Sequence, residues 1–188
     1  MGTFFKQGKK ISVRPLKGRY YPKVGDIVIG LVEDVALTSF SVNIGGPYPA
    51  ILLVSNATNA PFDPIKDDAR KIFKAGDAIR AEIISFDRTK DPQLNATKEG
   101  LGKLVGGRII DVNPMHVRRI IGRKGSMINL IKEKTKTKII VGHNGRIWIR
   151  GDELKMELLA TEAIEKIVRE AHVSGLTDRV AEFLSERS

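Results

Sequence analysis

Two glycines that flank two cations constrain the fold of this chain more than any other stretch. Gly122-Arg123-Lys124-Gly125 follows an apolar run and precedes Ser126, a residue suited to capping a helix. Glycine lets the backbone approach a partner without an intervening side chain. The amides that open the next helix are unpaired and carry partial positive charge, so such a turn suits a phosphate. A tight turn between two helices is the alternative, and the surrounding pattern must decide.

Positive charge is concentrated around this stretch. Residues 103–150 carry twelve basic residues against two acids, and residues 1–23 carry seven basic residues and no acid. Residues 24–99 and 151–188 are net acidic. This segregation is typical of a polyanion binder, with a solvated basic surface as the alternative. The cations of residues 1–23 fit a nucleic-acid arm or a solubilising tail equally well.

The chain lacks the features of secreted, membrane and disulfide-stabilised proteins. No apolar run is long enough to span a bilayer, and residues 1–12 have no apolar region of a secretory signal. The absence of cysteine excludes disulfides and thiolate metal sites. We therefore expect a soluble cytoplasmic protein with no membrane partner.

The sequence contains no recognisable catalytic or metal-binding constellation. His116, His143 and His172 lie far apart, with no carboxylate at metal-ligand spacing. Asp67-Asp68 is an adjacent acidic pair that solvation explains better than catalysis. No Walker-type loop and no nucleophile–base pair is present. We expect no catalytic residue, no metal and no cofactor, so the chain is predicted not to be an enzyme.

Residues 24–99 have the pattern of a small all-β domain. Apolar residues alternate with polar ones, as in Phe40, Val42 and Ile44, which predicts a buried face that includes Phe40. The expected strands cover residues 27–32, 39–44, 48–54, 78–86 and 93–98, with a turn at Asp91-Pro92 and a short helix near 66–73. Five short strands with one longer insertion predict a Greek-key barrel of the OB type.

Residues 104–171 predict the order β-α-α-β-β-α. The expected elements are a strand over 107–112, helices over 115–121 and 126–134, a hairpin with strands 137–141 and 146–150, and a long helix. Asn113, Ser126 and Asp152 are the expected N-caps, and Asn144-Gly145 is a strong hairpin signal. A glycine-rich linker over 98–104 precedes this region, and a short helix follows Gly175. A short edge strand is expected over residues 10–16.

This second region resembles a type I KH domain, through Ile120–Ile128, Lys138–Val141 and Asn144–Gly151. Residues 24–99 resemble an S1-type OB-fold. The order of the two, with Tyr20–Asp26 before the barrel and Gly100–Leu104 after it, resembles the KH-containing RNA-binding cap subunit of the archaeal exosome. The implied fold class is multidomain β plus α/β. Its expected parts are a basic arm or partial N-terminal domain over 1–22, the S1-type barrel over 23–99, the KH domain over 100–172 and a C-terminal helix over 173–188.

The resemblance implies a non-catalytic subunit that acts in RNA degradation. Three such subunits cap a hexameric phosphorolytic ring, bind single-stranded RNA (A-rich RNA included), and guide 3′ ends to the pore. The family has an N-terminal β-rich domain that contacts the ring, and only its tail is expected here, in residues 1–22. The alternatives are an assembly scaffold or a general single-stranded RNA-binding protein outside the exosome. A nuclease or phosphorylase is the least supported reading.

The candidate RNA-binding residues follow from the KH motif and from the barrel surface. In the KH domain they are Arg119, Ile121, Gly122, Arg123, Lys124, Gly125, Ser126, Ile128, Lys138 and Ile140. On the barrel they are Tyr48, for base stacking, and Arg80, for a phosphate. The isoleucines have a core role as their alternative, and Lys138 a solvated surface. Trp148 is expected to pack between the domains, with base stacking as its alternative.

Overall fold

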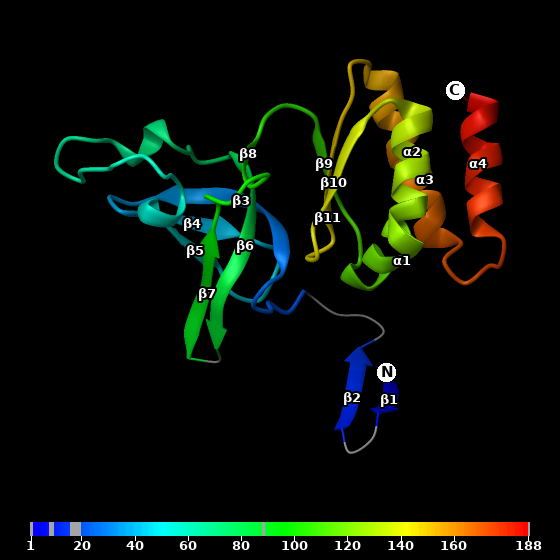
Figure 1. Cartoon of the computed structure of the whole chain (residues 1–188), viewed down its shortest axis with the longest axis horizontal. Coiled ribbons are helices and arrows are strands. Elements are labelled where there is room, and N and C mark those ends of the chain that lie inside the picture. The colour runs from blue at the N-terminus through cyan, green and yellow to red at the C-terminus, as the bar shows by residue number, and fades with distance from the viewer. Residues whose placement is uncertain (1, 8–9, 16–19, 88, 188) are drawn as a thin grey trace.

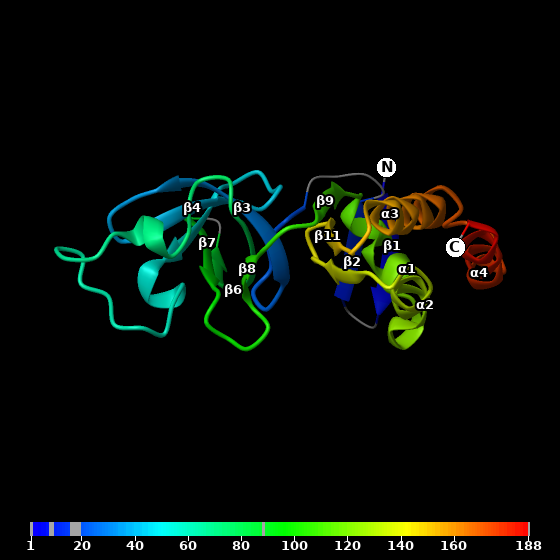
Figure 2. The ribbon, with the colours of Figure 1, turned by 90° about the horizontal axis from the view of Figure 1, so that it is seen from above.

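The structure is a computed structural model that describes residues 2–7, 10–15, 20–87 and 89–187. It has a β-barrel and an α/β domain side by side, as the two views in Figures 1 and 2 show. Near the N-terminus, strands β1 (Gly2–Gln7) and β2 (Lys10–Pro15) form an antiparallel hairpin. Strand β2 confirms the edge strand expected over residues 10–16, whereas β1 was not indicated by the sequence.

Five strands close into the predicted barrel. They are β3 (Ile27–Val35), β4 (Ser39–Asn43), β5 (Ala50–Leu53), β6 (Ala78–Asp87) and β7 (Lys90–Asn95). They pair in the order β3-β4-β5-β7-β6, and pairing of β3 with β6 closes the ring. The alternating pattern is confirmed, because Phe40, Val42 and Ile44 are fully buried and the Phe40 ring packs edge-on against Phe73 at 5.4 Å.

Some expected details of the barrel are wrong. Asp91 and Pro92 lie inside β7, and the turn falls earlier, where the Asp87 carboxylate accepts hydrogen bonds from the Thr89 amide and hydroxyl. Proline is tolerated in β7 because the pairing with β6 is irregular there. The expected helix near 66–73 is only a 3₁₀ turn over Ala69–Lys71. Part of the expected linker forms strand β8 (Gly102–Leu104), which pairs with β6.

The second domain has the predicted order β-α-α-β-β-α. Its elements are β9 (Arg108–Asp111), α1 (Val117–Ile121), α2 (Ser126–Thr135), β10 (Lys138–Val141), β11 (Arg146–Arg150) and α3 (Leu154–Arg169), followed by α4 (Leu176–Arg187). The sheet has the antiparallel order β10-β11-β9 and lies between the barrel and the helices (Figure 1). Ile147 and Ile149 of β11 are fully buried in the core shared with the helices.

Only one of the three predicted helix caps is confirmed. The Asn113 side chain accepts a hydrogen bond from the Met115 amide at 3.0 Å. Ser126 is already helical, because Gly125 takes the capping position in the left-handed conformation. Asp152 does not cap α3; Glu153 occupies the capping position, and the Glu157 carboxylate accepts from the Gly151 amide at 2.9 Å.

The turn between β10 and β11 joins the two domains. The buried Asn144 side chain donates to the carbonyls of Ile29 (2.8 Å) and Ile44 (2.9 Å) and accepts from the Ile29 amide at 3.2 Å. The His143 amide donates to the Ile27 carbonyl at 2.8 Å. The Arg146 guanidinium donates to the Asn43 side chain at 2.9 Å. The α/β domain is thus fixed to one end of the barrel by directional hydrogen bonds.

Candidate nucleic-acid interface

The loop between α1 and α2 has a backbone that glycine makes possible. Gly122 has φ +76° and ψ 178°, a region essentially restricted to glycine. A Cβ added there would lie 2.7 Å from Cβ of Met127 and 2.8 Å from its amide nitrogen. Gly125 has φ +81°, but an added Cβ would meet only the Asn129 side chain, at 3.5 Å. The two glycines therefore differ, since only Gly122 is required by both backbone and space.

Lysines with positive φ flank helix α2. Lys124 has φ +52° in the loop, and Lys136 has φ +51° just after the helix. They are the only non-glycine residues with positive φ in the described part of the chain. A side chain in the left-handed region costs on the order of 1 kcal/mol, and such strain clusters at functional sites. The strained backbone of Lys124 thus lies within the glycine loop itself.

The loop carries a local excess of exposed positive charge. Arg118, Arg123 and Lys124 are exposed and take part in no ion pair among the residues the structure describes. No acidic residue occurs between Asp111 and Glu133. The amino end of α2, which Ser126 opens, adds partial positive charge at the same place. The arrangement can hold a phosphate by backbone approach and countercharge together.

The predicted KH residues are only partly brought together. Gly122 to Gly125 and Ser126, the first residue of α2, form one continuous exposed or half-exposed stretch, and the half-buried Ile121 adjoins it. Arg119 is exposed, but its guanidinium donates to the Val173 carbonyl at 3.2 Å, near the end of α3. Ile128 is 6% exposed and packs in the core, which fits the core role that was its alternative.

The structure places the two residues predicted on β10, Lys138 and Ile140, on one face of the sheet. In the antiparallel pair, Ile140 faces Trp148 and Lys138 faces Arg150, whereas Ile139 and Val141 face the buried residues of β11. Paired residues point to the same side of a sheet. Ile140 and Lys138 therefore lie on the face away from the helices and from the glycine loop. Val141 lies on the opposite face of β10 and is half-buried against the helical core.

The two predicted RNA-binding residues of the barrel, Tyr48 and Arg80, are far in sequence from the Gly122–Gly125 loop and differ in solvent exposure. Tyr48 is 46% exposed, as its predicted stacking role requires. Arg80 is half-buried and donates to the Gly100 carbonyl at 3.0 Å, so a phosphate contact would have to displace that bond. Trp148 is 4% exposed and donates to the Gly106 carbonyl at 2.7 Å, which excludes base stacking in this conformation and fits the packing role.

Arg118 is a further exposed cation beside the loop and was not among the predicted residues, although it neighbours Arg119 on a short helix. The Phe86 ring adjoins both Tyr48 and Tyr21, and neither Phe86 nor Tyr21 carries a local sequence signal. The side chains of residues 1–19 lie outside the described part, so the role of the basic arm stays a prediction.

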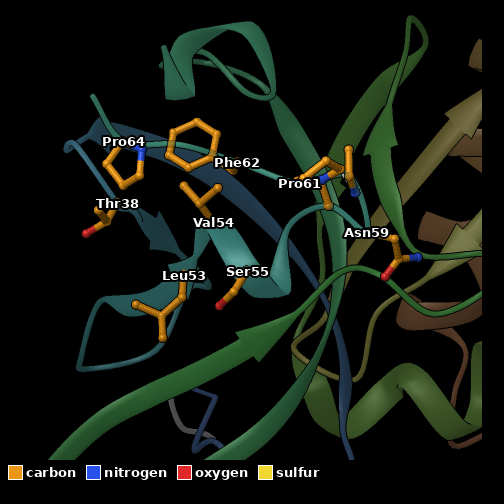
Figure 3. Close-up of a pocket in the computed structure, with 10 residues that line it drawn as sticks. Thr38, Leu53, Val54, Ser55, Asn59, Pro61, Phe62 and Pro64 are labelled. Atoms are coloured by element: carbon orange, nitrogen blue, oxygen red, sulfur yellow. Dashed lines mark hydrogen bonds between the residues drawn. The ribbon is translucent and has the colours of Figure 1, made fainter. Parts of the chain in front are cut away.

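A hollow of about 730 Å³ lies beside the barrel insertion, where Leu53, Val54, Pro61, Phe62 and Pro64 line it (Figure 3). None of its lining residues is charged, so it lacks the cations that hold a phosphate backbone. In the described ranges, no group of three or more His, Asp or Glu side chains could hold a metal ion. No helix there is long and apolar enough to cross a bilayer.

An OB-type barrel joined to a KH domain with an open basic loop defines a class of modular nucleic-acid-binding proteins. Two family models match in the corresponding places, "RRP4, S1 domain" over residues 19–85 and "KH domain" over residues 107–155. Neither describes a catalytic domain.

Relatives place the chain more narrowly. The exosome complex component Rrp4 of Ignisphaera aggregans is 46% identical over 178 residues, which cover 95% of this chain and 70% of that protein. The Thermococcus kodakarensis component of the same name is 46% identical over 185 residues, with 96% and 71% covered. A crystal structure described as a candidate exosome complex RNA-binding protein superposes with a TM-score of 0.84 at 42% identity, covering 90% of this chain and 97% of that one. The chain belongs to the Rrp4 family of exosome complex components, which confirms the resemblance seen in the sequence.

Proposed function

We propose that this chain is a non-catalytic RNA-binding subunit of an archaeal exosome. It forms a trimeric cap on the phosphorolytic ring and guides single-stranded RNA 3′ ends to the pore for 3′-to-5′ degradation. Membership of the Rrp4 family supports the exosome assignment. The observation that carries RNA binding is the Gly122–Gly125 loop, where a glycine-dependent backbone meets exposed Arg123 and Lys124 at the start of α2.

The sharpest test of the loop uses a matched pair of variants at Gly125. Asparagine and aspartate tolerate the left-handed conformation best among residues with a side chain, and the position has room for a Cβ. Gly125→Asn and Gly125→Asp therefore fold alike and differ in one negative charge. Gly122 is unsuitable, because any side chain there would collide with α2.

We expect Gly125→Asp to bind single-stranded RNA at least about tenfold more weakly than Gly125→Asn. A carboxylate about 5 Å from a bound phosphate costs about 0.8 kcal/mol in a water-like dielectric. Cancelling one cation removes one counterion-release contribution, about 1 kcal/mol at about 0.1 M salt. Fluorescence anisotropy with labelled oligoadenylate measures the ratio. Equal affinities for two folded variants would contradict the loop's role and favour the scaffold alternative.

Ring capping needs a separate experiment. Co-migration of the chain with a reconstituted archaeal phosphorolytic ring on a sizing column, with labelled A-rich RNA, tests docking and RNA retention together. Joining the ring and raising its RNA retention is the expected result. If the chain binds RNA but does not associate with the ring, the cap assignment is contradicted, and the result favours a general single-stranded RNA-binding protein. Shortening of RNA by the purified chain with phosphate or Mg²⁺ would contradict the non-catalytic assignment.

A further inference from the structure

Three aromatic rings gather at one end of the barrel. Tyr21 precedes β3, Tyr48 lies in the turn between β4 and β5, and Phe86 lies near the end of β6. The Phe86 ring centroid is 5.4 Å from that of Tyr21, edge-on at 73°, and 6.2 Å from that of Tyr48, tilted by 44°. Separate elements of the barrel thus bring the three rings into one cluster.

The cluster is anchored on one side and open on the other. Phe86 is partly buried against the barrel core, whereas Tyr21 is 52% and Tyr48 is 46% exposed. The adjacent Tyr20 differs from these two tyrosines, because it is only 6% exposed and its hydroxyl donates a hydrogen bond to Asp26 at 2.6 Å. Tyr20 therefore has a structural role. Since Phe86 holds both tyrosine rings in contact, a flat ligand can stack on them with little further loss of side-chain freedom.

The turn that carries Tyr48 also contacts the KH domain. The Ile44 carbonyl accepts from Asn144, and a Cβ added at Gly45 would lie within 4 Å of the Arg146 guanidinium. A Cβ added at Gly46 would lie 3.3 Å from the Tyr20 carbonyl, so the same turn packs on the segment that presents Tyr21. The aromatic cluster and the contact with the KH domain therefore lie at the same end of the barrel.

We propose that Tyr21, Tyr48 and Phe86 form a base-stacking platform for single-stranded RNA, a second contact for a strand held by the Gly122–Gly125 loop. The proposal rests on the proposed function and adds to it a second binding site. Residues 24–99 carry eleven acids against eight basic residues, so the barrel is poorly suited to hold phosphates. Stacking on aromatic rings is tolerant of sequence and does not need positive charge.

The test compares two lengths of oligoadenylate with two double variants. A KH domain clamps about four nucleotides, so an oligonucleotide of about four reports the loop alone, and one of about twelve also reaches the platform. Tyr21→Ala with Tyr48→Ala is expected to bind the longer RNA about tenfold more weakly and the shorter one unchanged. The control, Tyr21→Phe with Tyr48→Phe, keeps the rings and is expected to bind both like the parent.

Salt dependence separates stacking from charge. The slope of log affinity against log salt is expected to stay unchanged in the alanine variant, because no phosphate contact is lost. Unchanged binding of the longer RNA by the folded alanine variant would overturn the platform. A lower slope would overturn stacking as its mechanism. If the Gly122–Gly125 loop does not bind RNA, the assay gives a different result. Gly125→Asp and Gly125→Asn would then bind the shorter and the longer RNA with equal affinity.

Discussion

Replacing Asn144 by alanine should destabilise the protein by about 3 kcal/mol. The change removes two donated hydrogen bonds, to Ile29 and Ile44, and one accepted from the Ile29 amide. Each such bond contributes about 1 kcal/mol net, and a buried backbone group left without a partner costs about 1–3 kcal/mol. The estimate uses the low end, because water can enter where a side chain 5% exposed is truncated.

Chemical denaturation followed by two signals measures this loss. The only tryptophan, Trp148, is buried in the KH domain and reports that domain by fluorescence, while circular dichroism reports the whole chain. A loss of about 3 kcal/mol corresponds to a fall in Tm of about 6–12 °C for a chain of this size. Asn129→Ala is the control, because Asn129 is exposed on α2, and should stay within about 0.5 kcal/mol.

An isosteric variant tests the same interdomain hydrogen bonds. Asn144→Asp keeps the acceptor for the Ile29 amide but turns a carboxylate oxygen toward two carbonyl oxygens. It should therefore be less stable than Asn144→Ala at neutral pH, although it removes fewer atoms. If both variants unfold like the parent chain, the interdomain hydrogen bonds do not stabilise this fold, and the reasoning fails.

Further changes test the backbone and the charges. Lys136→Gly should stabilise the protein by about 1 kcal/mol in urea denaturation, because glycine relieves the left-handed strain after α2; a loss of stability would contradict this. Gly122→Ala should cost at least about 2 kcal/mol, more than Gly175→Ala, which has positive φ but open space around it; equal losses would refute the steric argument. Burial opposes ionisation of Asp77, but the hydrogen bonds from the Lys103 side chain and the Lys74 amide, with the charges of both lysines, together outweigh burial and lower the pKa of that carboxyl below its ordinary value of 3.8. The ion pair therefore stabilises the fold above that pH and is lost as pH falls through the lowered pKa, so Asp77→Asn should show a smaller loss of stability in acid titration.

Local patterns predicted the parts of this molecule that depend on neighbouring residues. The alternation of Phe40 with Val42 and Ile44 placed the barrel core correctly, and the glycine loop lies within one contiguous stretch. The face of Ile140 could not be read in the same way, because it depends on the register with β11. A short strand with apolar residues on both faces offers no alternation to decide between them.

Contacts between distant segments were beyond the reach of the sequence. Asn144-Gly145 correctly predicted a turn between β10 and β11, but nothing local showed that the amide of Asn144 would bind the backbone of β3. The cluster of Tyr21, Tyr48 and Phe86 is similar, because closure of the barrel brings its members together. Such sites depend on how distant strands are arranged in the fold, and a local sequence pattern does not contain that information.

The docking of Asn144 has a consequence for how the chain can be divided. Strand β4 pairs with β3 only from Leu31 onward, so the start of β3 has one side that the β10–β11 turn occupies. A barrel expressed without the KH domain would leave the amide and carbonyl groups of Ile27 and Ile29 open, and such edges recruit strands from other molecules. We therefore expect a barrel fragment separated from the KH domain to aggregate more readily than the whole chain.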